Sequence, residues 1–311
     1  MPMKSISNDE GVTENNYRIL ITGANGFTGQ HACTYFVNNG YTVFAAVRNP
    51  TVNFRQSINV VQCDLSNPTA VNEAIQSIKP DFILHLAGQN SVPASWKKPI
   101  ESIETNVLCT AYLLDAIRLF HPKCRIIVVG SMLQSKFSDP SSFLHPYSLS
   151  KTMQSLFAEV FSHLSKLDVI IAKPTNLIGP GHSTGICSVL ANKLAKLERG
   201  EGSKIIEIHN LLAARDFLDV RDAVKAYEIL LLKGTTRKVY EITTGNVISV
   251  QDVMTTYERL MDVPFEIKSE VIQHEPVDII QPTELNSLGW KPCIPFHQSL
   301  YDILQFYRMS I

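Results

Sequence analysis

The segment Tyr17–Gly29, YRILITGANGFTG, constrains the fold of this chain more than any other. Its apolar run Ile19–Ile21 is short and rich in β-branched residues, which predicts a buried strand. Three glycines follow at the spacing G-x-x-G-x-x-G, and the pattern then becomes helical. A strand, a glycine turn and a helix in this order are typical of a dinucleotide site.

Each glycine has its own predicted role in such a site. Gly23 permits the tight turn, Gly26 lets the backbone approach a pyrophosphate, and Gly29 allows the helix to pack closely on the strand. Phe27 and Thr28 begin the helix, whose N-terminal N–H groups and dipole favour phosphate. A purely structural turn is the alternative, but the strand and helix on either side favour the nucleotide site.

Composition limits the other possibilities. The 311 residues carry a net charge of -1, which gives no reason to expect a nucleic-acid or membrane partner. Residues 1–16 lack the apolar stretch of a secretory signal and are predicted to form a polar, flexible tail. The six cysteines form no C-x-x-C pair, so we expect buried reduced thiols in a cytoplasmic protein, and neither disulfides nor a metal site.

Strand and helix patterns alternate along the first half of the chain. Further strands are predicted at residues 41–47, 59–61, 81–86, 125–129 and 169–172, and a long helix is predicted at residues 100–120. Such alternation predicts βαβ units and a doubly wound parallel α/β sheet of the Rossmann type. His85, inside one of these strands, is predicted to be a packed core residue.

Candidate cofactor contacts follow the ends of these strands, where ligands of such sheets bind. Arg48 stands after the second strand, where an arginine suits the 2′-phosphate of NADP and an acid would suit NAD, so NADP(H) is favoured over NAD. The alternative for Arg48 is a solvated arginine in a loop. Asp64 and Leu65 follow the third strand, and Asp64 either accepts from the adenine amino group or caps a helix. The fourth strand runs into a small-residue turn that can lie flat against the cofactor, formed by Leu86, Ala87 and Gly88.

A possible catalytic set follows the fifth strand. Ser131 ends that strand, and Tyr147 and Lys151 are four apart at the start of a helical pattern, so they share one face. A free tyrosine, with a pKa of about 10, is a poor proton-transfer group at neutral pH. A neighbouring lysine cation favours the phenolate and lowers that pKa, while a serine hydroxyl can hold the substrate oxygen.

These residues together resemble the extended short-chain dehydrogenase/reductases, in the branch that modifies nucleotide sugars, from Tyr17 to Arg308. Within that branch the chain is most similar to the GDP-6-deoxy-4-keto-mannose reductases. The resemblance is carried by TGANGFTG at 22–29, Asp64-Leu65, SVPASW at 91–96, Ser131, PYSLSK at 146–151, NLIGPG at 176–181, RDFLDVRD at 215–222 and LGWKP at 288–292.

The resemblance implies an NADPH-dependent reduction of the C4 keto group of a nucleotide-linked 4-keto-6-deoxy sugar, with GDP favoured. Ser131, Tyr147 and Lys151 would be the catalytic residues, and Tyr147 and Lys151 would also contact the cofactor. The residues implied to bind the substrate are Gln89, Ser91, Asn176 and Arg215. For Asn176 a turn residue that satisfies local backbone is the alternative. A homodimer through a four-helix bundle is also implied, formed by residues 100–120 and 147–165 of each subunit.

The chain departs from the family at one position of chemical consequence. Leu133 stands where dehydratases of the superfamily carry a glutamate that takes part in water elimination, and leucine cannot transfer a proton. The segment from Ser131 to Tyr147 is also shorter than usual, which leaves the exact sugar open. The alternatives are a 4-epimerase or dehydratase of the same superfamily, or a non-catalytic NADP-binding protein.

Three parts are predicted along the chain: the tail at 1–16, a dinucleotide-binding domain at 17–176, and a mainly substrate-binding region at 177–311 with segments that return to the first domain. Asp219 and Ser249 are predicted helix caps, and Trp290 is predicted to pack in the core. Arg221 either pairs with an acid or reaches the nucleotide.

Overall fold

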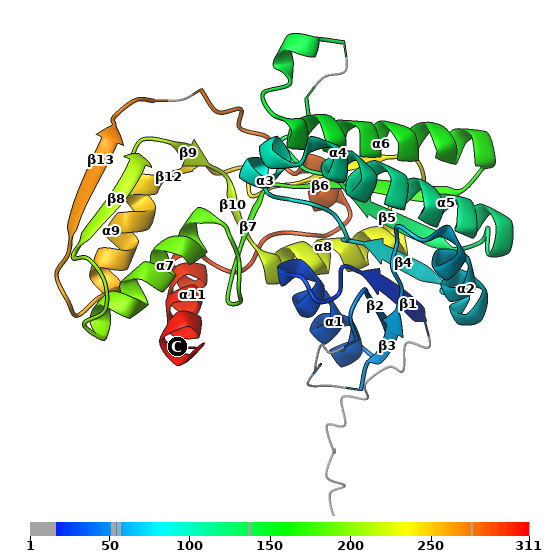
Figure 1. The fold of residues 1–311 in the computed structure, drawn as a ribbon, viewed down its shortest axis with the longest axis horizontal. Coiled ribbons are helices and arrows are strands. Elements are labelled where there is room, and N and C mark those ends of the chain that lie inside the picture. The colour runs from blue at the N-terminus through cyan, green and yellow to red at the C-terminus, as the bar shows by residue number, and fades with distance from the viewer. Residues whose placement is uncertain (1–16, 51–53, 55–56, 136–137, 275, 311) are drawn as a thin grey trace, which may run out of the picture.

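The computed structural model describes residues 17–50, 54, 57–135, 138–274 and 276–310 as two lobes side by side (Figure 1). The predicted tail at 1–16 lies outside the described residues. The larger lobe is built on a seven-stranded sheet, and the smaller lobe holds most of the chain after residue 176. A cavity lies between them, as described below.

The sheet of the larger lobe is parallel throughout, with strand order β11-β6-β5-β4-β1-β2-β3. This confirms the predicted doubly wound fold. The strand order reverses direction between β1 and β4, which places a crevice at the carboxyl ends of those strands. The strands are β1 (Arg18–Thr22), β2 (Thr42–Val47), β3 (Asn59–Gln62), β4 (Phe82–His85), β5 (Arg125–Val129), β6 (Asp168–Pro174) and β11 (Val239–Ile242).

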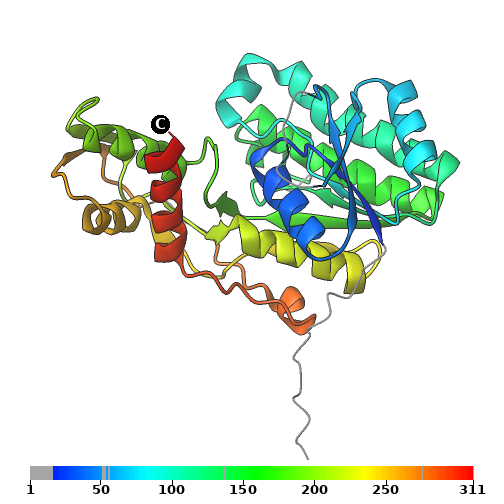
Figure 2. The same ribbon diagram turned by 90° about the horizontal axis from the view of Figure 1, so that it is seen from below.

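Helices cover both faces of this sheet. On one face α1 (Phe27–Asn38) and α8 (Val220–Lys233) pack side by side, as Figure 2 shows. On the other face lie α2 (Pro68–Ile78), α5 (Cys109–Phe120) and α6 (Pro146–Ser165). Within the described part of the chain, none of the helices is long and apolar enough to cross a bilayer.

The alternation of side chains along β1 explains why both faces are covered. Ile19 and Ile21 point into the core beneath α1 and α8, whereas Leu20 points into the core beneath α2, α5 and α6. Successive residues of a strand face opposite sides, so an unbroken apolar strand needs a helical layer on each side. The predicted burial of cysteines is confirmed at five of six positions, Cys293 being exposed, and none forms a disulfide.

The smaller lobe has its own core, where α7 (Ile186–Glu198), α9 (Val250–Leu260) and α11 (Phe296–Ser310) pack together. Three two-stranded pairs accompany them: β7 (Asn176–Ile178) with β10 (Phe217–Asp219), β9 (Ala214–Arg215) with β12 (Ile248–Ser249), and β8 (Ile205–Asn210) with β13 (Glu266–Val271). Between these segments the chain returns to the larger lobe as α8 and β11, followed later by α10 (Thr283–Ser287). The predicted domain boundaries themselves stay a prediction.

The predicted helix at 100–120 is helical throughout but has a local irregularity. It begins as α4 (Pro99–Ile103), continues through one π-helical turn, η1 (Glu104–Leu108), and becomes α5. Before it lies the short helix α3 (Val92–Lys97), and the 3-10 turn η2 (Pro140–Ser142) precedes α6. The π turn points Asn106 into the protein, where it is fully buried and donates to the backbone oxygen of Gln89.

The predictions for the caps and for Trp290 are confirmed. The Ser249 side chain caps α9 in a reciprocal arrangement with Asp252, and Asp219 caps α8 by accepting from the backbone of Arg221. Trp290 is buried and donates to the backbone oxygen of Asp222.

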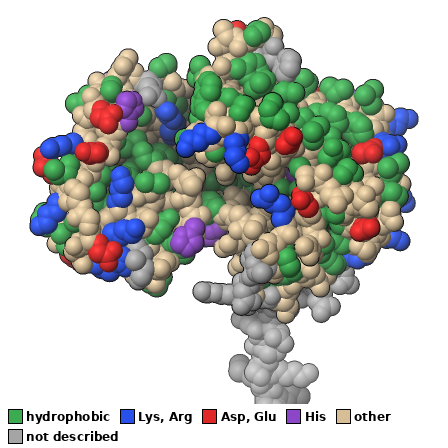
Figure 3. Space-filling model, in the orientation of Figure 1, with side chains coloured by type: hydrophobic (Ala, Val, Ile, Leu, Met, Phe, Trp, Pro, Cys, Tyr) green, Lys and Arg blue, Asp and Glu red, His purple; other side chains and the backbone are tan. Residues whose placement is uncertain are grey.

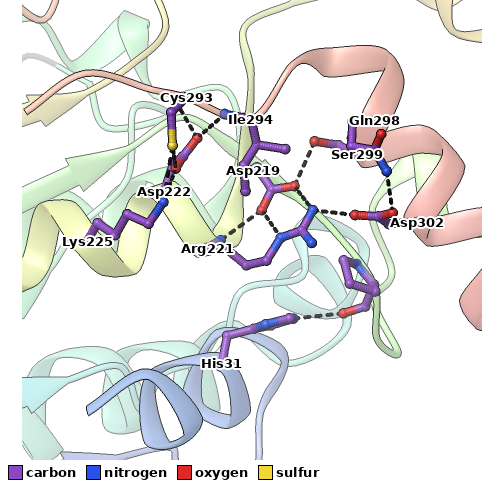
Figure 4. A network of polar contacts seen from close by, with 11 residues as sticks. His31, Asp219, Arg221, Asp222, Lys225, Cys293, Ile294, Gln298, Ser299 and Asp302 are labelled. Carbon is purple, nitrogen blue, oxygen red and sulfur yellow. Dashed lines mark hydrogen bonds and ion pairs between the residues drawn. The ribbon is translucent and has the colours of Figure 1, made fainter. Parts of the chain in front are cut away.

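Arg221 joins the two lobes. Of the two alternatives for this residue, an acid partner or the nucleotide, the structure shows the acid partner. Its guanidinium bonds the buried carboxylate of Asp219 at 2.8 Å through both Nε and Nη2, and it also bonds Asp302 of α11 at 2.6 Å (Figure 4). Ser299 of α11 donates to the same Asp219 carboxylate. His31 of α1 contacts the backbone oxygen of Pro180 at 2.7 Å nearby. The start of α8 is therefore tied to the C-terminal helix, and α1 is tied to the loop after β7.

We predict unequal effects on stability when the two ends of this ion-pair network are removed. Arg221→Met leaves the Asp219 carboxylate buried without its cation and should lower the free energy of unfolding by about 2–3 kcal/mol. Asp302→Asn removes a partly exposed partner while Asp219 stays paired, so it should cost about 1 kcal/mol or less. Urea unfolding of both variants measures this difference, and equal losses would contradict the assignment of Asp219 as the buried centre.

Candidate active site

A cavity of about 1160 Å³ opens at the carboxyl ends of the parallel strands. Its walls come from both lobes: the glycine turn and strand ends of the larger lobe, and β7, β9 and the start of α7 from the smaller one. Figure 3 shows the surface hollowed between the lobes. This is the edge at which sequence analysis placed the candidate residues.

The glycine turn has the geometry that its three predicted roles require. Gly23 has φ +65°, and a Cβ there would lie 2.8 Å from the backbone nitrogen of Ala87, so a larger residue would push β1 and β4 apart. A Cβ on Gly29 would overlap the backbone of Gly23 and Ala24, so α1 could not pack against the turn. Gly26 lines the cavity, and a Cβ at this position would lie 3.2 Å from the backbone oxygen of Gly23.

Arg48 and Asp64 lie together at one end of the cavity. Both are exposed and line it, with Leu65 buried beside them. The Asp64 carboxylate accepts from the backbone and hydroxyl of Ser66, and these bonds, helped by the charge of Arg48, hold its pKa below the usual range. Asp64 does not cap α2, because Asn67 does so. The carboxylate is thus ionised and available to the cavity.

Ser131 and Tyr147 meet inside the cavity. Ser131 follows β5, and Tyr147 lies in the first turn of α6, which Pro146 begins and the His145 side chain caps. Both side chains are buried, and both line the cavity. Burial raises the pKa of Tyr147 above that of a free tyrosine, and the Ser131 hydroxyl acts in the opposite direction.

Lys151 is close to this pair along α6 but is not among the described residues that line the cavity. Its Nζ donates to the backbone oxygen of Val129 at 2.7 Å and to Oε1 of Gln154 at 2.5 Å. Burial lowers the pKa of Lys151 to about 7. The expected lowering of the tyrosine pKa by the lysine is not seen in this arrangement, because burial and the Ser131 hydroxyl account for the shift in the pKa of Tyr147.

Leu133 lies two residues beyond Ser131 and lines the cavity. Its side chain is 45% exposed, and its backbone N–H donates to the Ser131 hydroxyl oxygen at 3.1 Å. The position at which dehydratases were expected to carry an acid is thus an apolar part of the wall. The backbone N–H of Leu133 orients the serine hydroxyl, but its side chain cannot donate a proton.

Two of the four predicted substrate residues line the cavity. Asn176 and Arg215 do so, and the side chain of Asn176 donates to the backbone oxygen of Asp216 at 3.1 Å, which joins β7 to the start of β10. Gln89 and Ser91 are not among the described lining residues. Ser91 caps α3, and Gln89 donates to the Ser91 backbone oxygen at 2.7 Å. Their substrate roles stay predictions.

The predicted residues that the cavity brings together are Gly23, Gly26, Phe27, Thr28, Gly29, Arg48, Asp64, Leu65, Leu86, Ala87, Gly88, Ser131, Tyr147, Asn176 and Arg215. Sequence reasoning missed several others that share its walls. These are Asn90, Thr105, His182, Asn192 and Tyr307. Thr105 comes from the π turn and Tyr307 from α11, and neither position has a local motif, so only the tertiary fold identifies them.

The residues present fit a dinucleotide. The turn is closed to side chains at Gly23 and Gly29 and faces the cavity at Gly26, where a phosphate needs room. The following helix α1 directs its first N–H groups to the same place. Arg48 offers a cation at the far end.

Comparison with known proteins identifies the family. The model of the NAD dependent epimerase/dehydratase family matches residues 19–243, so the chain belongs to this family. The GDP-6-deoxy-D-mannose reductase of Pseudomonas aeruginosa is 26% identical over 94% of this chain and 98% of its own length. The dTDP-D-glucose 4,6-dehydratase of Bos taurus is also 26% identical, over 94% of this chain and 88% of its own. The predicted resemblance to the extended short-chain dehydrogenase/reductases is confirmed.

Solved structures share the fold. The structure of RMD from Pseudomonas aeruginosa complexed with NADPH superposes with a TM-score of 0.79 and 24% identity, covering 95% of this chain and 100% of that one. The UDP-glucose 4-epimerase of Thermus thermophilus, in complex with NAD, has a TM-score of 0.79 and 19% identity, covering 94% and 100%. The matches to solved structures show the same fold, and the family model and the sequence relatives make the chain an enzyme of the nucleotide-sugar epimerase, dehydratase and reductase group.

Proposed function

We propose that this enzyme uses NADPH to reduce the C4 keto group of a nucleotide-linked 4-keto-6-deoxy sugar, with GDP as the favoured nucleotide. The observation that supports this most is the pair of hydroxyls of Ser131 and Tyr147 in one cavity with the glycine turn. The similarity to a GDP-6-deoxy-D-mannose reductase over nearly the whole chain supports the choice of substrate.

The two hydroxyls are the groups assigned to contact the keto oxygen. Bound NADPH would supply the hydride to C4. The Ser131 hydroxyl holds the keto oxygen, and Tyr147 gives its phenolic proton to that oxygen as the carbonyl becomes an alcohol. A tyrosine with a raised pKa is protonated at neutral pH, which is the form that reduction requires. In the reacting complex, the phenolate that remains would be stabilised by the positive charge of Lys151, one helical turn away. In this structure Lys151 does not shift the pKa of the protonated Tyr147.

Leu133 favours a reductase over a dehydratase. Water elimination needs a further acid–base group, and this wall of the cavity offers an apolar side chain at that position. A 4-epimerase of the same superfamily is the second reading, because it oxidises and re-reduces with the same hydroxyls. Arg48 counts against it, since that chemistry is generally associated with NAD. A non-catalytic NADP-binding protein would not need Ser131 and Tyr147 together.

The two lobes are assigned to different parts of the ligands, because each lobe forms its own part of the cavity wall. We assign the larger lobe, residues 17–176, mainly to the dinucleotide and residues 177–311 mainly to the nucleotide sugar. Asn176 and Arg215 would bind the diphosphate or sugar at the boundary, because a guanidinium can grip a diphosphate through two hydrogen bonds.

Turnover of the four nucleotide-linked 4-keto sugars tests the proposed reaction. NADPH oxidation should occur with one of the GDP-, UDP-, dTDP- or CDP-linked 4-keto-6-deoxy sugars, with the GDP sugar preferred. Tyr147→Phe should reduce kcat by about a thousandfold or more, since it removes the only proton donor assigned to the keto oxygen. The dissociation constant of NADPH should stay within about threefold.

The control for this assay is Leu133→Val, which keeps an apolar wall and should retain turnover. Wild-type protein that binds NADPH but reduces none of the four sugars would contradict the proposal. Equal turnover by wild type and Tyr147→Phe would remove the tyrosine from the mechanism.

Binding of NADPH and NADH tests the proposed cofactor choice. Arg48→Ala should weaken NADPH binding by about 10- to 100-fold, because a hydrogen bond between charged groups contributes about 1.5–3 kcal/mol. NADH, which lacks the 2′-phosphate, should bind the variant and the wild type alike. Fluorescence titration of both dinucleotides measures this. A loss that is equal for NADPH and NADH would show that Arg48 does not read the phosphate.

A homodimer is the proposed assembly. In Figure 3 hydrophobic side chains gather over the helices near α6. Exposed apolar residues of α6 recur at helical spacing, which leaves a stripe that a second copy can cover: Leu149, Leu156, Val160 and Leu164. The neighbouring α5 adds Leu119 and Phe120, which are also exposed. Two helices from each subunit would then form a four-helix bundle.

Light scattering at micromolar concentration tests this assembly, and the wild type should have the mass of a dimer. Val160→Lys introduces a charge into the stripe and should yield a monomer. Ile272→Lys is the matched control, since Ile272 is an equally apolar, exposed side chain on the smaller lobe and its variant should remain dimeric. A monomeric wild type would refute the assembly.

A further inference from the structure

Lys151 is held by a buried side chain that the proposed reaction does not use. Gln154 is one turn along α6, is fully buried, and accepts from Nζ of Lys151 at 2.5 Å. The second acceptor is the backbone oxygen of Val129. Among the described residues, these two oxygens are the hydrogen-bond partners of the ammonium group, and one of them belongs to a replaceable side chain.

The direction of each hydrogen bond behind Gln154 can be assigned. The Thr110 hydroxyl donates its single hydrogen to the backbone oxygen of Asn106 at 2.7 Å. It must therefore accept from the Gln154 Nε2 group, 2.9 Å away. This orients the Gln154 amide with Oε1 toward Lys151. The opposite orientation would place an N–H donor against the ammonium group.

His85 completes the chain of hydrogen bonds, and the direction assigned to the Thr110 hydroxyl selects one of its two tautomers. Its Nε2 lies 2.8 Å from the Thr110 oxygen, which has no hydrogen left to give, so Nε2 carries the proton. Burial and the charge of Lys151 lower the pKa of His85 to about 3, so the ring is neutral. Its Nδ1 accepts from the Thr22 hydroxyl at 2.8 Å, and the Thr22 oxygen accepts from the backbone N–H of Ala87.

This buried chain therefore runs from Lys151 to the wall of the cavity beside the glycine turn. Its side chains come from α6, α5, β4 and β1, and all of them except Lys151 are completely buried. No member can turn without leaving a buried polar atom unpaired, which is costly in a protein interior. The amide oxygen of Gln154 is held in place accordingly.

We propose that Gln154 is a positioning residue that sets the orientation and the protonation of Lys151, and through Lys151 the pH range in which Tyr147 transfers its proton. This inference rests on the proposed reductase chemistry. An oxygen that accepts from the ammonium favours the charged form, whereas burial disfavours it. The titratable group that interacts with Lys151 is His85 on β4, and Tyr147 lies one turn before Lys151 on the same helix. The two hydrogen-bond partners of Lys151, on β5 and α6, are uncharged.

The test is the pH profile of kcat/KM for NADPH-dependent sugar reduction by three proteins. In the wild type, activity should fall on the alkaline side as Lys151 loses its proton. Gln154→Leu removes the acceptor and should move this limb about one unit to lower pH. Gln154→Glu places a carboxylate beside the ammonium and should move it about one unit to higher pH. Opposite shifts are the result expected from positioning, whereas a merely structural role would lower activity at all pH values alike.

The control is Met153→Leu, an isosteric change at the adjacent position of α6, whose profile should match that of the wild type. Urea unfolding midpoints would show whether each variant is folded, and Gln154→Glu keeps the test open if Gln154→Leu does not fold. Alkaline limbs that coincide in wild type, Gln154→Leu and Gln154→Glu would overturn the inference.

A second measurement separates this inference from the proposed reaction. The NADPH dissociation constant as a function of pH needs no sugar, and the anionic cofactor should bind less tightly as Lys151 loses its charge. If no sugar is reduced but the pH at which NADPH binding weakens moves in opposite directions in the two Gln154 variants, the proposed reaction is wrong and the positioning role stands. If that pH does not move in either variant, the positioning role is rejected, whether or not a sugar is reduced.

Discussion

The close approach of the first and fourth strands is the constraint on which the site depends. At Gly23 the turn after β1 passes so near Ala87 that a single Cβ would lie 2.8 Å from its backbone nitrogen. The hydroxyl of Thr22 accepts from the same nitrogen, so the two strand ends are bonded where they are closest. This contact brings the glycine turn and the small-residue turn of residues 86–88 to one edge, and the remaining walls are built around it.

Much of this edge could be predicted from the sequence because its signals are local. Glycine spacing, the residues after each strand, and a tyrosine and lysine four apart on a helix all depend on short-range geometry. The structure places nearly all of these residues in one cavity. For Asp64 short-range contacts exclude the alternative of a helix cap, because its carboxylate bonds Ser66 and Asn67 caps α2.

What the sequence could not show depends on contacts between distant segments. Arg221 had two plausible partners, and its choice of Asp219 and Asp302 depends on where α11 packs. Tyr307 reaches the cavity for the same reason. The π turn at Glu104–Leu108 has no pattern of its own, and its inward-facing Asn106 is explained by buried partners far away in the chain. Burial of Tyr147 and Lys151 likewise moved both pKa values in directions that helical spacing alone did not indicate.

The polar chain beneath the cavity explains how helix α6 can carry a buried lysine against the sheet. A buried ammonium is costly unless its hydrogens are accepted, and the acceptors here are a strand-end carbonyl and an amide that is itself held by Thr110. Because Thr110 also fixes the tautomer of His85, the arrangement is complete only when β1, β4, α5 and α6 are all in place. The same packing that forms the core of the larger lobe therefore decides the environment of the lysine, and the chemistry proposed for Tyr147 depends on side chains that never reach the cavity.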